Sequence, residues 1–208
     1  MSRIWAPQTT LPGLLVLSTL LAGSGCGSSS IPVPTSYAKF NAPDGTFQCD
    51  YPAGWESSTG GMPGQLRTAS FTRGGASIHV TADLAGSLLG DIARSGSGLA
   101  SGMAGVEEQR IPPVEALHEM GLRSAEEEIS NYKEQPHETI QSQLGDARRS
   151  EFTGTAGVLQ QKIHGYRTTV LGTQRRFTII CKCPESDWKT LQPALDRVIS
   201  SLAPGEQR

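Results

Sequence analysis

Three cysteines are the side chains of this chain best suited to chemistry. Cys181 and Cys183 flank Lys182 on one expected strand, and Cys49 lies on the apolar face of another. Thiols two residues apart on a strand are separated by about 7 Å, too far for an easy disulfide, but either one could reach Cys49. Three interpretations stay open: a structural disulfide from Cys49 to one of them, reduced thiols that pack as small apolar residues, or a redox or metal site. The Cys-x-Cys spacing lacks the pattern of a zinc knuckle, and no second pair follows.

Histidines give no sign of a catalytic centre. His79, His118, His137 and His164 are scattered, without the H-x-x-x-H or H-E-x-x-H spacing of a helical metal site. His118, which Glu119 follows on an expected helix, is the best candidate for a polar contact. A general base also needs a nucleophile beside it, and none is identifiable. We therefore expect a protein that is not an enzyme, with no catalytic residue, no metal site and no cofactor.

Charge excludes generic nucleic-acid binding. The chain has 18 Lys and Arg against 20 Asp and Glu, a formal net charge of -2, so it lacks a broad basic field for a phosphate backbone. Five arginines on neighbouring expected strands could form a small basic patch, or could be solvated residues that discourage aggregation of edge strands. They are Arg148, Arg149, Arg167, Arg175 and Arg176.

The first residues are typical of an exported protein. An apolar stretch over residues 11–22 follows a single charge at Arg3, and it is too short to cross a bilayer as a helix, which needs roughly 20 residues. Gly25 precedes Cys26 at its end, which resembles the bacterial lipobox, although Gly23 stands where Leu is usual. We expect residues 1–25 to be a lipoprotein signal peptide and Cys26 to carry diacylglycerol and an acyl chain such as palmitate. A plain secretory signal with an incidental cysteine is the alternative.

The remaining pattern predicts one domain of the α+β class. Residues 26–36 have the Gly/Ser/Pro composition of a tether, residues 37–203 form the folded domain, and residues 204–208 form a disordered tail. A period of two predicts strands, and a 3.6-residue period predicts helices. The expected strands are 47–51, 66–72, 76–84, 143–152, 159–171 and 176–183, and the expected helices are 114–120, 125–132 and 188–202. The last helix carries an apolar stripe, with Ser186 as its expected cap and Pro193 near its start.

Two separated motifs resemble the PsbP-like superfamily. Residues 40–47 (FNAPDGTF) and 51–55 (YPAGW) resemble its opening, and residues 165–167, 177–181, 188–191 and 198–202 resemble its end. The resemblance covers about residues 37–202 and implies an α/β/α sandwich with a mainly antiparallel sheet. That fold is shared by an extrinsic photosystem II subunit, a Ran-binding import factor and many bacterial lipoproteins. We expect the matched aromatic residues to be structural core: Phe47, Tyr51, Trp55, Phe177 and Trp188.

The functional expectation is a binding or docking module. Members of the superfamily share docking or small-ligand binding and no common catalytic machinery, so the fold alone transfers no activity. We expect a lipid-anchored protein of the cell envelope that faces the periplasm or exterior and contacts the membrane through its anchor. It would bind an unknown protein or small molecule, for example in envelope or complex assembly. The alternative is a thiol-dependent redox or metal-handling protein that uses Cys49, Cys181 and Cys183.

The lipid anchor yields a direct prediction. Cys26→Ser removes the thiol that would be acylated, so the variant should lose incorporation of a fatty-acid analogue and move from the membrane to the soluble fraction. Stable retention needs more than one acyl chain, so partial acylation would not suffice. Ser28→Ala, two residues further on, should leave labelling unchanged. Unchanged labelling of Cys26→Ser would contradict the lipoprotein interpretation.

Overall fold

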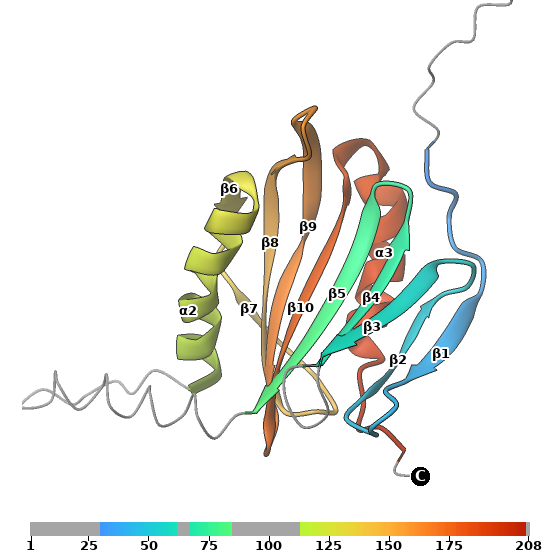
Figure 1. The fold of residues 1–208 in the computed structure, drawn as a ribbon. Coiled ribbons are helices and arrows are strands. Elements are labelled where there is room, and N and C mark those ends of the chain that lie inside the picture. Colours follow the sequence, from blue (N-terminus) through green and yellow to red (C-terminus); the bar gives the residue numbers. More distant parts are fainter. Residues whose placement is uncertain (1–29, 62–66, 85–112, 207–208) are drawn as a thin grey trace, which may run out of the picture.

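One antiparallel sheet organises the domain (Figure 1). The computed structural model describes residues 30–61, 67–84 and 113–206. Eight strands form the sheet in the order β3-β4-β5-β10-β9-β8-β6, with β7 also paired to β8, and β1 and β2 form a separate hairpin. The elements are β1 (Tyr37–Asn41), β2 (Gln48–Pro52), β3 (Glu56–Gly61), β4 (Arg67–Arg73), β5 (Ala76–Leu84), α2 (Pro113–Glu128), β6 (Ser130–Glu134), β7 (Glu138–Ile140), β8 (Asp146–Ala156), β9 (Gln161–Leu171), β10 (Arg175–Pro184), the 3-10 helix η1 (Glu185–Asp187) and α3 (Trp188–Ser200).

The two helices lie on opposite faces of the sheet. On β9, Thr169 contacts α2 through His118, whereas Tyr166 contacts α3 through Gln192. Because side chains alternate along a strand, residues an odd number of positions apart point to opposite faces. The arrangement confirms the predicted α+β class and mainly antiparallel sheet.

An apolar core fills the space between the sheet and α3. On β10, Phe177, Ile179, Cys181 and Cys183 are buried, and the residues between them are half-buried, as the alternating pattern predicts. On α3 the buried stripe includes Trp188, Leu191, Leu195 and Val198. These residues belong to one continuous cluster, in which Phe47, Trp55 and Phe177 are also buried. Tyr51 is half-buried and stacks on Phe71, with 4.5 Å between ring centroids.

Trp188 is the first residue of α3 and seals one end of this core. Its indole stacks on the His164 imidazole at 4.0 Å between centroids and 6°, and meets the Tyr166 ring edge-on at 5.0 Å. Ser186, the expected cap, lies instead in η1, and the residue at the N-cap position, Asp187, makes no side-chain capping hydrogen bond. The Asp187 carboxylate instead accepts a hydrogen bond from the amide of Ile31 at 3.4 Å.

Several expected boundaries differ from the structure. Residues 114–120 and 125–132 do not form two helices: α2 is continuous from Pro113, and Tyr132 lies in β6. Proline suits the first position of a helix, and one internal glycine costs only about 1 kcal/mol, so neither breaks α2. The strands β1, β3, β6 and β7 were not expected.

Both ends of the domain extend beyond the expected limits. Ile31, placed in the expected tether, is buried in the core cluster. Glu206, placed in the expected tail, donates its amide to Asn41 Oδ1 at 3.3 Å. The signal peptide and residues 26–29 of the expected tether, Cys26 included, lie outside the described residues. No helix in the part of the chain that the structure describes is long and apolar enough to cross a membrane.

One glycine allows the central strands to pack closely. A Cβ atom on Gly165 of β9 would collide with the carbonyl oxygen of Cys181 and would lie 2.8 Å from the ring of Phe152. Phe152 is fully buried and belongs to a small second cluster with Ile129 and Ile163 on the α2 face. The ring of Phe152 therefore packs in the space that a side chain at position 165 would occupy.

Trp188→Ala tests how α3 is held. Only 7% of this side chain is exposed, so its removal leaves a large cavity and should lower the free energy of unfolding by about 3–5 kcal/mol. Chemical denaturation should show a lower midpoint with an unchanged slope. Lys189→Ala, exposed on the next residue, should change stability little. Full stability of Trp188→Ala would contradict the structural role.

Candidate functional site

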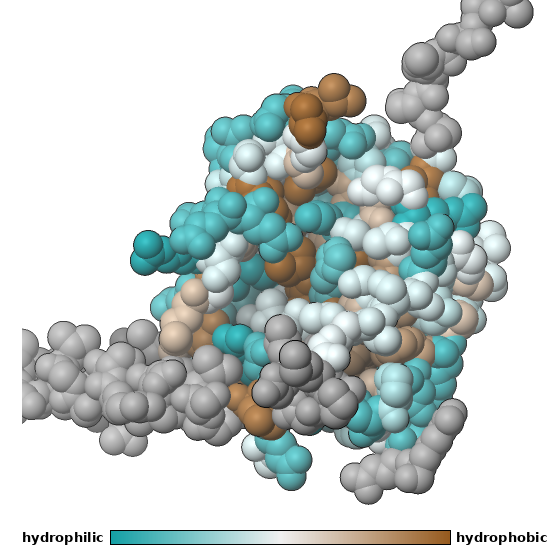
Figure 2. All heavy atoms as spheres, viewed as in Figure 1, coloured by the Kyte–Doolittle hydropathy of each residue, from teal (hydrophilic) through white to brown (hydrophobic). Residues whose placement is uncertain are grey.

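A groove runs between α2 and the open part of the sheet. The helix packs over β8 and β9 and leaves the same face of β10 and β5 uncovered by any described helix. The groove has a volume of about 280 Å³. Its helix wall is formed by Leu117, Met120, Gly121, Ser124, Ala125 and Glu128, and its floor and ends by Thr81, Asp83, Arg167, Thr169, Arg176, Thr178 and Ile180. Figure 2 shows apolar surface between α2 and β5.

Strand register builds the floor from three aligned hydroxyls. Thr178 of β10 pairs with Thr81 of β5 on one side and with Thr169 of β9 on the other. Their side chains therefore form a row across the sheet, perpendicular to the strands. Ile180, two residues further along β10, adds apolar surface next to this row. The floor thus combines hydroxyl groups with one aliphatic side chain.

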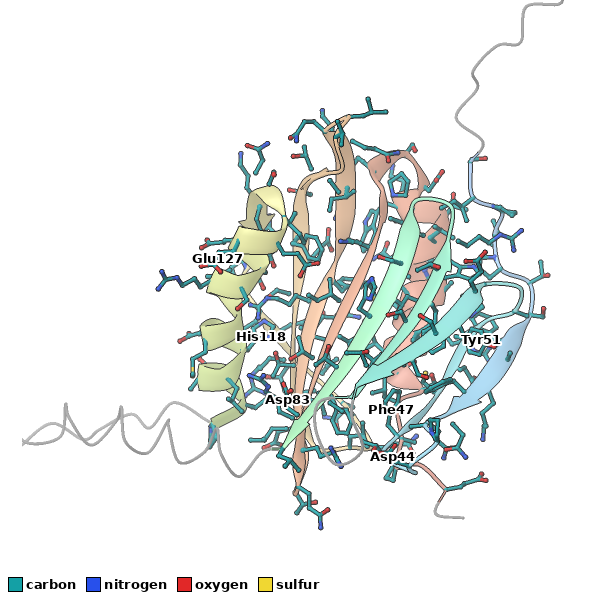
Figure 3. All side chains as sticks on the ribbon, in the orientation of Figure 1. Asp44, Phe47, Tyr51, Asp83, His118 and Glu127 are labelled. Atoms are coloured by element: carbon teal, nitrogen blue, oxygen red, sulfur yellow. The ribbon has the colours of Figure 1, made fainter. Side chains whose placement is uncertain are left out.

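Charged pairs close the two ends of the groove. At one end Arg176 Nη2 donates to Asp83 Oδ2 at 2.5 Å, and at the other Lys182 lies 3.7 Å from the Glu128 carboxylate. Figure 3 shows Asp83 and His118 on the groove side of the structure, and Glu127 on the outer side of α2. The Arg176 Nε atom is buried and has no hydrogen-bond partner among the described residues. Buried donors in proteins are nearly always paired, so the partner of this atom is expected outside the described residues.

A buried polar cluster beneath α2 holds the groove wall in place. The Arg167 guanidinium donates to Glu134 Oε1 at 2.8 Å and to the carbonyl oxygen of His118 at 2.6 Å. The His118 ring bonds Ser150 Oγ through Nε2 at 2.9 Å and Thr169 Oγ1 through Nδ1 at 3.0 Å. His118 and Arg167 are 1% and 3% exposed, so this cluster is part of the interior. It ties together α2, β6, β8 and β9.

Small residues let the helix approach this cluster. A Cβ atom on Gly121 would lie 3.0 Å from Arg167 Nη1, which is tighter than most real contacts. Glycine at this position therefore gives the guanidinium room below the helix. Sequence reasoning singled out His118, with Glu119 after it, as the best candidate for a polar contact. His118 has polar partners on β8, β9 and β6, whereas Glu119 is exposed.

The cluster shifts the pKa values of its members. Burial lowers the pKa of His118, and this outweighs the opposing hydrogen bond with Glu134, so the ring is neutral at pH 7. Burial would raise the pKa of Glu134, but hydrogen bonds from His118, Ser150 and Arg167 outweigh it and lower that pKa to about 2. The 3.5 Å approach of His118 to Glu134 is accordingly a neutral polar contact, and the ion pair of the cluster joins Arg167 to Glu134.

Of the two alternatives for the five arginines, a single basic patch does not fit the structure, because neighbours on a strand point to opposite faces. Arg148, Arg167 and Arg176 lie on the α2 face, and Arg149 and Arg175 lie on the α3 face. Four of the five are also near carboxylates: Arg148 approaches Glu115, Arg149 binds Glu138 and Asp196, Arg167 binds Glu134, and Arg176 binds Asp83.

The three cysteines belong to the interior rather than to the groove. Cys49, Cys181 and Cys183 are free, buried thiols in the structure. Burial raises the pKa of Cys49 and of Cys183 to about 12, and it raises that of Cys181 as well. Thiols in this state are poor nucleophiles and poor metal ligands. Within the described residues, no group of three or more His, Cys, Asp or Glu side chains could hold a metal ion.

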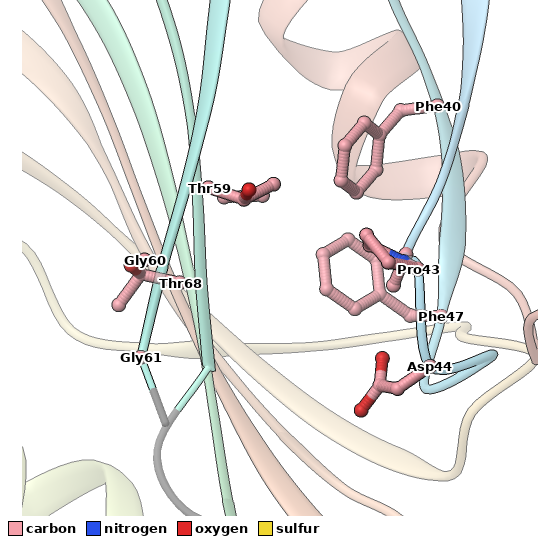
Figure 4. Close-up of a pocket in the computed structure, with 10 residues that line it drawn as sticks. Phe40, Pro43, Asp44, Phe47, Thr59, Gly60, Gly61 and Thr68 are labelled. Atoms are coloured by element: carbon pink, nitrogen blue, oxygen red, sulfur yellow. The ribbon is translucent and has the colours of Figure 1, made fainter. Parts of the chain in front are cut away.

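Two other hollows are less suited to a ligand. Figure 4 shows Phe40, Pro43, Asp44 and Phe47 of the β1–β2 hairpin facing the ends of β3 and β4, around a pocket of about 100 Å³. It is too small for more than a few atoms. A wider hollow of about 360 Å³ lies between the hairpin turn and the β9–β10 turn, but its lining is mainly polar loop residues. Among these three hollows of the described residues, the α2 groove is the one that offers both room for a ligand and apolar side chains beside converging polar groups.

Comparison with known proteins supports the fold assignment. No protein-family model and no curated protein sequence matches the chain. The solution structure of cyanobacterial PsbP (CyanoP) from Synechocystis superimposes with a TM-score of 0.52 at 12% identity, over 86% of this chain and 96% of that one. The fold is PsbP-like.

Two further solved structures show weaker similarity. LpqN of Mycobacterium tuberculosis, described as involved in cell envelope biogenesis, gives a TM-score of 0.45 at 8% identity, over 82% of this chain and 92% of that one. A Pseudomonas aeruginosa protein, described as a putative regulator of unknown function, gives 0.43 at 10% identity, over 82% and 98%.

The Glu134 carboxylate gives the domain a predicted acid sensitivity. Its pKa falls from an ordinary 4.5 to about 2 on folding, which corresponds to about 3 kcal/mol of stabilisation that is present above pH 4.5 and lost as the pH falls towards 2. Glu134→Gln should be less stable at pH 7, because Arg167 stays buried without its counter-charge, and should lose less stability between pH 4.5 and 2.

Urea unfolding at a series of pH values measures this difference. Glu127→Gln on the exposed face of α2 is the control, and its profile should match the unaltered protein because an exposed i,i+4 pair contributes little. Parallel pH profiles for Glu134→Gln and the unaltered protein would show that the cluster does not stabilise the fold in this way.

Proposed function

We propose that the chain is a binding module of the cell envelope, held at the membrane by a lipid on Cys26, and that its ligand occupies the α2 groove. The ligand class that suits the groove is a small neutral molecule with an apolar body and an oxygen acceptor. The observation that carries this proposal is the groove itself, a hollow of about 280 Å³ in which Leu117, Met120 and Ile180 lie beside a row of threonine hydroxyls. An acceptor oxygen of the ligand would pair with one of these hydroxyls, because a polar group buried without a partner costs about 1–3 kcal/mol.

Charge balance supports a neutral ligand. Arg176 is paired with Asp83, Arg167 with Glu134, and Lys182 lies near Glu128, so the positive and negative groups around the groove balance. A charged ligand would lose hydration without gaining a free counter-charge. The threonine row and Ile180 instead offer hydroxyl and aliphatic contacts.

Volume sets the size of the ligand. At about 280 Å³ the groove is slightly below the range of roughly 300–1,000 Å³ that drug-sized ligands occupy. It therefore suits a small molecule, or one segment of a longer amphipathic one. Met120 on the groove wall is 51% exposed, and a flexible thioether at the rim can adapt to different apolar shapes.

Placement in the envelope rests on the sequence. The apolar run that ends at Gly25 and Cys26 supports export and acylation, and the Gly/Ser/Pro-rich residues after it support a short connection to the domain. The His118 ring is buried and bonded at both nitrogens, and in this proposal it positions the helix that forms the groove wall.

Binding of the neutral dye N-phenyl-1-naphthylamine tests the groove. The purified full chain should enhance its fluorescence with a saturable isotherm. Ser124→Trp places an indole in the groove from an exposed position on α2, so it should weaken binding by about tenfold or more, equivalent to about 1.4 kcal/mol. Replacing the exposed Ser124 should leave the buried cluster beneath the helix intact.

Glu126→Trp is the matched control. Position 126 is exposed on the same helix, on the side away from Leu117, and adds the same indole outside the groove. It should bind the dye like the unaltered protein. Equal binding by Ser124→Trp and Glu126→Trp, with both variants folded, would exclude the groove as the binding site.

A further inference from the structure

The turn between β8 and β9 exposes two adjacent aliphatic side chains. Val158 is 99% exposed and Leu159 is 92% exposed, the highest values among the large apolar residues that the structure describes. Figure 2 shows this turn as an apolar projection at one end of the molecule. Single exposed apolar residues are common on protein surfaces. Two neighbours that both project fully from a hairpin tip form one joined apolar surface.

Hydrogen bonds fix the shape of this turn. The Gln160 amide donates to the Gly157 carbonyl oxygen at 3.1 Å, and Thr155 Oγ1 donates to the Gln160 side chain at 2.9 Å. Gly157 and Gln160 both adopt positive φ angles, of 72° and 51°. The tip, defined as Val158 and Leu159, is therefore presented by an ordered hairpin and has no apolar core beneath it to fold into.

The tip and the start of the described chain lie at the same end of the sheet. A Cβ atom on Gly74, in the β4–β5 turn, would lie 3.4 Å from the Ile31 side chain, and one on the adjacent Gly75 would lie 3.7 Å from Gln161 at the start of β9. Figure 1 shows the β8–β9 turn, the start of the described chain before β1 and the start of α3 at this end. Ile31 is fixed in place because it is buried and bonded to Asp187.

Chain length sets how far this end can lie from a lipid on Cys26. Ile31 is five positions after Cys26, and a fully extended chain spans at most about 3.6 Å per position, or about 18 Å in total. An acylated Cys26 lies at the bilayer surface, so the end of the domain that holds Ile31 is kept within about that distance of the membrane.

We propose that the tip inserts Val158 and Leu159 into the interfacial region of the bilayer that holds the lipid anchor. The inference rests on the anchor of the proposed function. Aliphatic side chains gain free energy by entering the headgroup and acyl boundary, and interfacial segments reach depths of about 5–10 Å there. Lys162, exposed three residues after Leu159, brings an ammonium group to the level of the lipid phosphates.

Insertion would also orient the groove. β10 runs from Arg175 at the far end of the sheet to Pro184 at the tip end, so the groove lies along the strands with its Lys182 and Glu128 end nearer the membrane. The Arg176 and Asp83 end then faces away from the bilayer. A second attachment point beside the anchor would hold the domain in this orientation, where the lipid alone would let it rotate.

Fluorescence quenching by lipids tests the tip. Leu159→Cys is labelled with an environment-sensitive nitrobenzoxadiazole dye on the purified, lipidated full chain in vesicles of phosphatidylethanolamine and phosphatidylglycerol. The buried native thiols are shielded from the reagent. We expect a blue shift of emission on vesicle binding and strong quenching by nitroxide-labelled lipids.

Leu84→Cys is the matched control at the opposite end of the sheet. Leu84 is 52% exposed and pairs with Arg175, far from the tip, so its label should show neither the shift nor the quenching. Equal, weak quenching at both positions in chains that fractionate with the vesicles would overturn the tip proposal and leave the anchor intact. A concentration-dependent blue shift of the Leu159→Cys label without vesicles would also overturn it, because a second copy of the chain would then cover the tip.

Fractionation separates the tip from the anchor. A chain that does not fractionate with membranes when expressed with its first 26 residues would show that the anchor is wrong, and the tip proposal would fall with it. The double variant Val158→Ser, Leu159→Ser should stay in the membrane fraction, because two or three acyl chains retain the protein. A dye on Lys162→Cys should nevertheless be quenched less in this double variant than in a chain that keeps Val158 and Leu159.

Discussion

Arg167 determines where α2 lies, and the groove depends on that placement. Its guanidinium bonds the Glu134 carboxylate of β6 and the His118 carbonyl oxygen of α2 while its own strand, β9, lies near the middle of the sheet. An arginine with 3% exposure needs such partners, since an unpaired buried charge destabilises a protein by about 3–5 kcal/mol. The helix is thereby held over β8 and β9, and half of the sheet face stays uncovered by a described helix.

The two faces of the sheet differ in chemistry. Towards α3, alternate residues of β5 and β10 are Ile78, Val80, Phe177 and Ile179, which are fully or almost fully buried. The residues that alternate with these along the same strands point towards α2. They include His79, Thr81, Thr178 and Lys182, which are half-buried. A strand whose two sides differ in this way cannot slip by one position without exposing its apolar side, so the register of the groove floor is fixed by the core on the far side.

Local sequence patterns predicted the elements that have an apolar face, and missed the others. The alternation on β5 and β10 and the stripe on α3 are strong signals because each element buries one side. The strand β3, with sequence ESSTGG, is exposed along its whole length, and β6 is short and polar, so neither carries a period of two in hydrophobicity. They are strands because neighbouring strands supply hydrogen bonds, which is a tertiary effect.

The site was less predictable, because its parts come from distant positions. Gly121 and Ser124 on α2 and the threonines at 81, 169 and 178 become neighbours only when the helix is placed over the sheet. The same holds for His118, whose partners Ser150 and Thr169 are 32 and 51 residues away. The alternative of an arginine patch is excluded by a local rule, since adjacent strand residues point to opposite faces. The cysteines attracted attention as rare and reactive residues, although burial makes these thiols inert.

Gly165 places a limit on how related sequences can diverge. Because the backbone of Cys181 and the ring of Phe152 occupy the space where a Cβ atom would be, no single substitution at position 165 can be accepted on this backbone. Evolution could change this position only after β9 and β10 had moved apart and position 152 had become smaller. In divergent chains with this fold, glycine at 165 and a large aromatic residue at 152 should therefore be inherited as a pair, and they offer a landmark for alignment where overall identity is too low to guide one.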